Sequence, residues 1–226
     1  KMDFLGLKNL TVIQDAVQHI RVHTPEFDIN NISLDDKPTL ELLNRGETMG
    51  VFQLESGGMV ETCRKYGIQK IDDIIDLLAL YRPGAMDYID QMIEVKKGIK
   101  PVAYEHPLLE EICGDTYGVM IYQEQVQNAA KVLAGYTLGG ADLLRRAMGK
   151  KKKEILDAEF VPFSEGMRAN GYGDPAINKL WEILVPFSDY AFNKSHTAGY
   201  GLVSYWTAYL KANYPAEYMA ALLTSV

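Results

Sequence analysis

The chain has 226 residues, 47% hydrophobic and 23% charged, a composition ordinary for a globular protein with one large or two small domains. Its apolar runs are short and interrupted, which excludes a membrane-spanning helix. The two cysteines, Cys63 and Cys113, lack the spacing of metal ligands, which excludes a cysteine zinc site and argues against a disulfide framework. We therefore expect a protein of the reducing cytoplasm with no membrane partner.

Neither end of the sequence resembles a natural terminus. An apolar, strand-like run from Met2 to Leu7 follows Lys1 directly, and residues 220–226 still have a helical pattern. We expect the chain to be part of a longer protein, so its lack of a signal peptide says little about that protein.

Helices dominate the expected secondary structure, with proline near first turns and glycine after last turns as boundary signals. In chain order, helices are predicted at residues 37–45, 68–81, 88–97, 107–112, 123–134, 138–148, 153–169, 177–185, 200–214 and 215–226. Short strands or extended segments are predicted at 49–54 and 117–122, and a flexible loop at Gly57–Gly58. The sequence contains no repeat and no clear domain break, so the predicted fold class is mainly α with a few short strands.

Positive charge is concentrated in the segment from Arg145 to Lys153, here called the basic stretch. It holds six positive charges in nine residues. The whole chain has a net charge of −7, and the rest of the chain, with 17 basic and 30 acidic residues, has a net charge of −13. Such a distribution attracts anions at one place and repels polyanions elsewhere.

Two explanations of the basic stretch compete. Cations at a helix end suit the helix dipole, so this segment could be a solvated face. Arg145 and Arg146 favour phosphate binding instead, because a guanidinium is a planar fork that matches phosphate oxygens. Adjacent helical residues point roughly 100° apart. Both arginines therefore serve one ligand only if it lies between them; otherwise one holds a nucleotide and the other a backbone phosphate.

The polar run at residues 193–197 is the second candidate site. A polar turn that caps a helix explains it equally well. If the run is a binding site, Lys194 supplies a charge for a phosphate, and Asn193, Ser195 and His196 can reach sugar or phosphate oxygens.

Asp3 is the third candidate, because a carboxylate among apolar residues on a strand is costly unless it is paired, hydrogen-bonded or metal-bound. Phosphoryl-transfer chemistry at a two-metal site needs several carboxylates to hold two Mg²⁺ ions, and one aspartate is insufficient. A surface position is the commoner explanation of a single aspartate near a terminus.

Several segments together resemble the alpha subunits of bacterial DNA polymerase III, the C-family replicative polymerases. The matching segments are KMDFLGL at 1–7, GVFQLES at 50–56, LYRPG at 80–84, YQEQV at 122–126, LAGYTLGGADLLRRAMGKK at 133–151, FNKSH at 192–196 and YPAEYMAA at 214–221. They span essentially the whole chain, and the run at 133–151 is highly specific. Gln127 and Trp206 depart from the family pattern, which has methionine and glutamine there.

The resemblance implies a multi-helix fingers domain at residues 11–226, preceded at residues 1–10 by the C-terminal edge of the catalytic palm with the end of a palm strand. Asp3 would be catalytic and metal-binding, as the third palm aspartate; the other two would precede Lys1, and the complete enzyme would hold two Mg²⁺ ions. The implied nucleotide-binding residues are Lys1, Arg145, Arg146, Asn193, Lys194, Ser195 and His196. The implied DNA-binding residues are Lys150, Lys151, Lys152 and Lys153.

The implied reaction is template-directed addition of deoxynucleoside triphosphates to a primer 3′-hydroxyl, with release of pyrophosphate, in the bacterial cytoplasm. The implied partners are the nucleotide, primer–template DNA and other replisome subunits. We expect this chain alone to be inactive, because two metal carboxylates are missing. Two alternatives remain: a module that binds nucleic acid without catalysis, with a steep salt dependence, and an unrelated nucleotide hydrolase, which lacks the support of a Gly-Lys-Ser/Thr phosphate loop.

Overall fold

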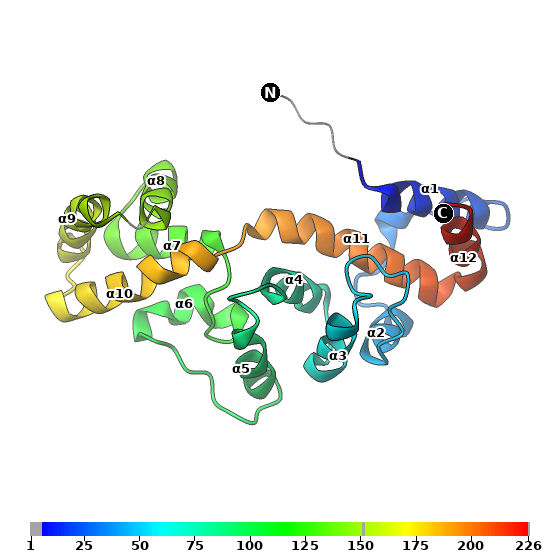
Figure 1. The fold of residues 1–226 in the computed structure, drawn as a ribbon, viewed down its shortest axis with the longest axis horizontal. Coiled ribbons are helices and arrows are strands. Elements are labelled where there is room, and N and C mark those ends of the chain that lie inside the picture. The colour runs from blue at the N-terminus through cyan, green and yellow to red at the C-terminus, as the bar shows by residue number, and fades with distance from the viewer. Residues whose placement is uncertain (1–5, 151, 226) are drawn as a thin grey trace. The chain divides into compact units, whose positions relative to one another are not determined.

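The computed structural model describes residues 6–150 and 152–225, and helices make up the regular structure of these residues (Figure 1). The described α-helices are α1 (Lys8–Arg21), α2 (Lys37–Asn44), α3 (Gly57–Tyr66), α4 (Ile71–Leu80), α5 (Asp87–Lys96), α6 (Glu110–Cys113), α7 (Gln123–Ala134), α8 (Leu138–Gly149), α9 (Lys153–Ala169), α10 (Asp174–Tyr190), α11 (Lys194–Asn213) and α12 (Pro215–Thr224). The mainly α fold class is therefore confirmed. In this part of the chain, every helix is too short or too polar to cross a lipid bilayer.

The short strands predicted at 49–54 and 117–122 are not present in the described residues. Residues 49–54 form turns, closed by a 2.6 Å hydrogen bond from the Thr48 hydroxyl to the Leu54 carbonyl oxygen. At 117–122 the backbone turns through left-handed conformations at Tyr117 and Gly118, and Tyr122 forms only an isolated bridge with Phe192. Both apolar runs bury side chains in loops, because neither has a neighbouring strand to complete a ladder.

Several helix boundaries also differ from those predicted. Gly57–Gly58 begins α3 and is not a loop, and α1 was not predicted. The Thr137 side chain accepts a 3.1 Å hydrogen bond from the Gly140 backbone and caps α8, as expected. Helix α9 continues through Pro162, also as expected.

The chain divides into two compact units, which the sequence did not reveal. Unit 1 comprises Lys1–Leu78 and His196–Val226, and unit 2 comprises Ala79–Ser195. Because residues 79–195 interrupt unit 1, helix α4 ends and helix α11 begins within unit 2.

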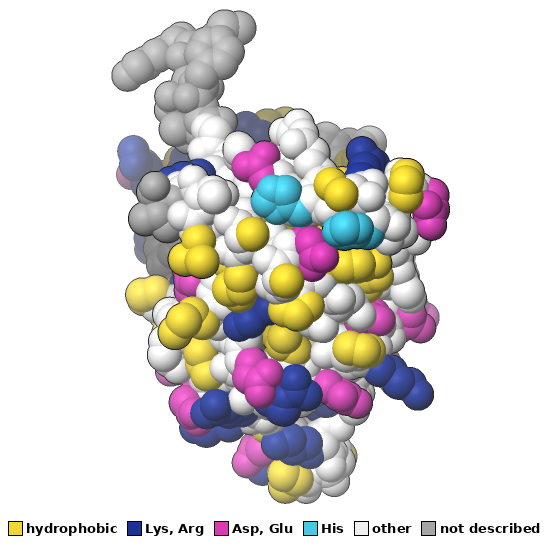
Figure 2. Space-filling view, turned by 90° about the vertical axis from the view of Figure 1, so that its right-hand side faces the viewer, with side chains coloured by type: hydrophobic (Ala, Val, Ile, Leu, Met, Phe, Trp, Pro, Cys, Tyr) yellow, Lys and Arg dark blue, Asp and Glu magenta, His cyan; other side chains and the backbone are white. Residues whose placement is uncertain are grey.

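Unit 1 has a core in which α1 packs against α12. Its apolar side chains include Val12, Ile13, Ala16, Val17, Ile20, Leu210, Tyr218 and Ala221. Hydrophobic side chains and histidines also gather on an outer face of the molecule (Figure 2). On this unit, exposed Val22 and the histidines His19 and His23 line a shallow hollow together with residues of α12.

Unit 2 is a bundle in which α7 packs against α8 and α9, and α10 packs against α8. Its core holds the buried side chains of Leu133, Leu144, Phe163, Leu180 and Leu184, among others. Gly166 on α9 lies so close to α7 that a Cβ atom there would overlap the Ala134 carbonyl oxygen. This close approach fixes α7 and α9 against each other, and α7 carries the candidate site.

Candidate functional site

Helix α7 supplies the framework of the candidate site in unit 2. The buried Gln125 side chain fixes its beginning: its Oε1 accepts hydrogen bonds from the backbone amides of Ile121 (2.7 Å) and Tyr122 (2.9 Å), and its Nε2 donates to Thr116. The Phe192 amide donates to the Ile121 carbonyl (2.9 Å), and the Gln123 amide donates to the Phe192 carbonyl (2.8 Å). These bonds hold the start of the polar run beside the first turn of α7.

The two predicted phosphate-binding arginines lie on α8 and converge on one carboxylate. Arg145 Nη2 lies 3.0 Å from Asp142 Oδ1, and Arg146 Nε lies 2.8 Å from Asp142 Oδ2. From α7, Gln127 Nε2 donates to the same Oδ1 over 3.0 Å. We name Asp142, Arg145, Arg146 and Gln127 the arginine cluster. In this cluster one carboxylate contacts both arginines at once.

Charge and exposure differ within the arginine cluster. The Arg145 hydrogen bond, with the positive charges of Arg146 and Arg145, lowers the pKa of Asp142, so this carboxyl is ionised at neutral pH. The Arg145 side chain is 16% exposed, whereas that of Arg146 is 66% exposed. Arg145 is therefore a fixed element of the site, and Arg146 reaches into solvent.

The described lysines of the basic stretch lie at the junction of two helices. Lys150 follows the C-terminal end of α8, while Lys152 and Lys153 lie at the N-terminal end of α9, and all three are exposed. The helix dipole favours a cation at the C-terminal end of α8 but disfavours cations at the N-terminal end of α9. The dipole alone therefore does not explain Lys152 and Lys153. Lys151 lies outside the described residues.

A second carboxylate organises the polar run. Both carboxylate oxygens of Glu124 accept the Lys194 backbone amide, at 3.0 and 2.9 Å, and Glu124 Oε1 also accepts from Asn193 Nδ2 at 3.2 Å. The Lys194 ammonium lies 5.2 Å from the centre of the Tyr122 ring. The polar run is therefore more than a turn that caps its own helix. Glu124 on α7 binds the backbone amide of Lys194, the first residue of α11.

The polar run crosses the boundary between the two units. Ser195 is exposed and is the last residue of unit 2. His196 belongs to unit 1, where its ring stacks on Tyr200 with 4.4 Å between ring centres. Lys1 and Asp3, the predicted palm residues, lie outside the described residues.

A cavity of about 340 Å³ lies along α7. Its wall includes Gln127 of the arginine cluster and Glu124 and Lys194 of the polar run. Acidic Asp115 and basic Lys131 also line it. Of the predicted binding residues, Lys194 lines this cavity, and Gln127 on its wall donates a hydrogen bond to Asp142 of the arginine cluster.

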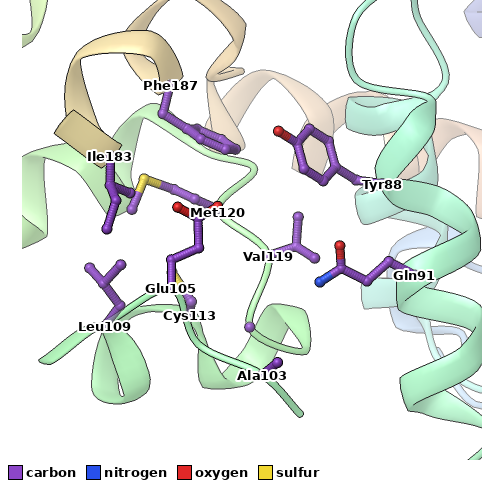
Figure 3. A pocket seen from close by; sticks show the side chains of 11 residues that line it. Tyr88, Gln91, Ala103, Glu105, Leu109, Cys113, Val119, Met120, Ile183 and Phe187 are labelled. Carbon is purple, nitrogen blue, oxygen red and sulfur yellow. The ribbon is translucent and has the colours of Figure 1, made fainter. Parts of the chain in front are cut away.

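A second, much smaller cavity in unit 2 has a different character (Figure 3). It measures about 40 Å³, and Tyr88, Met120, Ile183 and Phe187 are among its lining side chains. Burial, with the nearby charge of Glu105, raises the pKa of the Cys113 thiol on its wall to about 12, so the thiol stays protonated. A space of this size does not admit a nucleotide and is a packing void of the core.

Within the described residues, no group of three His, Cys, Asp or Glu side chains is placed to hold a metal ion. Asp142 has a signal in the sequence, because an aspartate three and four positions before two arginines on a helix can pair with both. Glu124 has no such signal, because its partners are about 70 residues away along the chain.

Unit 2 thus combines an arginine pair on α8, exposed lysines at the ends of α8 and α9, and a cavity along α7. The chain belongs to the bacterial DNA polymerase III alpha subunit finger domain family, whose profile matches residues 9–171. It is 57% identical to the DNA polymerase III subunit alpha of Saccharopolyspora erythraea over all of this chain and 19% of that protein. The subunits of Mycobacterium tuberculosis (54%, all of this chain, 20% of that protein) and Thermus aquaticus (48%, 99% of this chain, 19% of that protein) are also similar.

These relatives confirm the family that the sequence motifs indicated. The chain spans about a fifth of the length of the curated relatives it matches.

Proposed function

We propose that this segment binds the triphosphate of an incoming deoxynucleoside triphosphate, and the adjacent DNA, within a replicative DNA polymerase. The observation that carries the proposal is the convergence of Arg145 and Arg146 on a single anionic group. The family membership supports the reaction: template-directed transfer of a nucleotide to a primer 3′-hydroxyl with release of pyrophosphate.

In such a reaction the protein positions the reactants and stabilises charge as it moves onto the leaving pyrophosphate. Fixed guanidinium groups are suited to this, because they need no reorganisation when the charge develops. Arg145 and Arg146 would contact the β and γ phosphates, and Asn193, Lys194, Ser195 and His196 would line the nucleotide site. Lys150, Lys151, Lys152 and Lys153 would contact backbone phosphates of the primer–template.

Two Mg²⁺ ions belong to the reaction that the family implies, and the described residues include no cluster that fits them. Asp3 is a suitable ligand by its chemistry but is insufficient alone. We therefore assign the charge-binding role to this segment and expect the isolated chain not to polymerise. We propose that residues 1–10 belong to the palm and residues 11–226 to the fingers, in a protein that works with other replisome subunits in the bacterial cytoplasm.

Replacing Arg145 in the full-length polymerase that contains this segment tests the proposal. We expect Arg145→Ala to lower kcat/KM for nucleotide by roughly 10- to 100-fold, because it removes charge stabilisation in the transition state. Arg168→Ala is the matched control: Arg168 pairs with Asp174 on the same unit, with side chains 52% and 66% exposed. Steady-state kinetics that are the same for both variants and the wild type would contradict the assigned role.

A module that only holds nucleic acid is the second candidate, favoured by the exposed Lys150, Lys152 and Lys153. It predicts that the chain binds duplex DNA but no free nucleotide. If all six cations of the basic stretch met phosphates, the slope of log affinity against log salt would be roughly −5.

A further inference from the structure

The carboxylate of Asp142 contacts three side chains on two helices, through hydrogen bonds and an ion pair. Its Oδ1 accepts from Arg145 Nε (3.3 Å), Arg145 Nη2 (3.0 Å) and Gln127 Nε2 (3.0 Å). Its Oδ2 lies 2.8 Å from Arg146 Nε. Both carboxylate oxygens of Asp142 therefore have partners. Each arginine contacts the carboxylate through the side of its guanidinium that carries Nε.

This arrangement differs from an ordinary surface ion pair. Arg168 and Asp174 in the same unit form such a pair, with both side chains more than half exposed. Asp142 is 30% exposed and Arg145 16% exposed, and the carboxylate lies between two cations. Exposed pairs of the Arg168 kind contribute little to folding stability, whereas a carboxylate between two guanidiniums offsets the repulsion that would drive them apart.

Gln127 ties this group to α7. Its amide reaches from α7 to Asp142 on α8, and the same side chain lines the 340 Å³ cavity. A methionine at this position would have no N–H donor and could not form this hydrogen bond.

We propose that Asp142, held by Gln127, is a positioning residue that orients Arg145 and Arg146 toward one polyphosphate. The inference rests on the proposed function, because it assumes that the arginines bind the triphosphate. Arginines ordered before binding lose less side-chain entropy when the ligand arrives. Removing the carboxylate should therefore weaken binding although it also removes a negative charge from the site.

The test uses the 226-residue chain as wild type, Asp142→Asn and Gln127→Met, with Asp174→Asn as the matched loss of an arginine partner. Deoxyadenosine triphosphate is titrated by calorimetry, and the arginine Nε–Hε signals are followed by ¹⁵N NMR relaxation. We expect Asp142→Asn to weaken binding about tenfold and to mobilise the Arg145 signal, because charge-assisted hydrogen bonds are lost. Gln127→Met should weaken binding about threefold, because it removes one of the hydrogen bonds that hold the carboxylate, and Asp174→Asn should leave it unchanged.

The two readouts separate the inference from the proposed function. If the wild type does not bind the nucleotide, the proposed function fails. Arginine signals equally ordered in wild type, Asp142→Asn and Gln127→Met overturn the positioning role, whatever the binding result. Tighter binding by Asp142→Asn also overturns it, because the carboxylate then only competes with phosphate. Gln127→Met leaves all charges in place. If Asp142→Asn does not fold, the arginine signals of Gln127→Met test the positioning role.

Discussion

Units 1 and 2 use polar side chains for different purposes. In unit 1, buried hydroxyl groups of α11 and α12 fasten the helices to loops: Tyr205 donates to the Ser33 carbonyl (2.8 Å), Tyr218 to the Gly50 carbonyl (2.6 Å) and Ser204 to the Phe52 carbonyl (2.8 Å). In unit 2, the charged contacts lie at the surface of an apolar bundle, around Asp142 and Glu124. These polar residues of unit 1 fasten helices to loops, whereas those around Asp142 and Glu124 in unit 2 form the site that we propose binds a ligand.

The comparison can be tested because each unit contains one of the two tryptophans. Trp206 packs against the core of unit 1, and Trp181 packs against Phe160 and Phe163 in unit 2. Fluorescence of the single-tryptophan variants Trp206→Phe and Trp181→Phe therefore reports urea unfolding of one unit at a time. If every substitution below shifts both transitions equally, the distinction between the units does not hold in solution.

The largest effect is expected from Gly166→Ala in unit 2. Its added methyl group overlaps the Ala134 carbonyl oxygen, so α7 and α9 must move apart. We expect a loss of about 3 kcal/mol in the free energy of unfolding, seen in the Trp181 transition. Gly139→Ala on α8 is the control, because nothing lies within 4 Å of a Cβ there, and its helix propensity should add about 0.5 kcal/mol.

Tyr205→Phe should give a smaller loss in unit 1. The fully buried side chain donates to the Ser33 carbonyl and accepts from the Asp36 amide at 3.0 Å. Burial raises the pKa of Tyr205 to about 12, so the hydroxyl stays a donor at neutral pH. Without it, two backbone groups lose a partner, and we expect the Trp206 transition to lose about 2 kcal/mol. An unchanged Trp206 transition would mean that these bonds do not hold the loop.

The smallest loss of stability is expected from removing the side chains that cap two helices. Asp36 caps α2 in unit 1, and Thr137 caps α8 in unit 2, so either residue changed to alanine should cost about 1 kcal/mol at neutral pH. Partial burial alone raises the pKa of Asp36, but hydrogen bonds from Thr39 and Asn213 outweigh it and lower the pKa below 3.8.

The two caps should respond differently to acid. A carboxyl with a lowered folded-state pKa contributes its full stability above the ordinary value and loses it as the pH falls through the folded value. The cost of Asp36→Ala, measured from the Trp206 transition, should therefore shrink below pH 3.8. The cost of Thr137→Ala should not change with pH, and a parallel decrease at both caps would contradict this account.

The sequence predicted those features that depend on neighbouring residues. Helix α7 was placed at residues 123–134 because Gly135 ends it, and α9 was predicted at 153–169 despite Pro162. The strand predictions at 49–54 and 117–122 were wrong, because a short apolar run does not reveal whether a partner strand exists. The start of α11 was placed at residue 200 and lies at Lys194, because Glu124 caps it from another helix.

The candidate site was predictable to a similar degree. Arg145 and Arg146 stand out in the sequence because the basic stretch concentrates charge, and Asp142 was within reach of a helical spacing argument. The hydrogen bond between Gln127 and Asp142 joins two helices, and the hold of Glu124 on Lys194 depends on the Phe192 bridge. Such contacts follow from packing, which a single sequence does not encode locally.

The interrupted course of unit 1 has a consequence for synthesis on the ribosome. Unit 2 is continuous, so all of its residues have been made once Ser195 is added. The pairing of α1 with α12, by contrast, joins residues as far apart as His19 and Glu217, and must wait until the end of the segment emerges. Since domains fold as units during translation, the helical bundle of unit 2 would fold first, and α1 would pack only after α12 has been made.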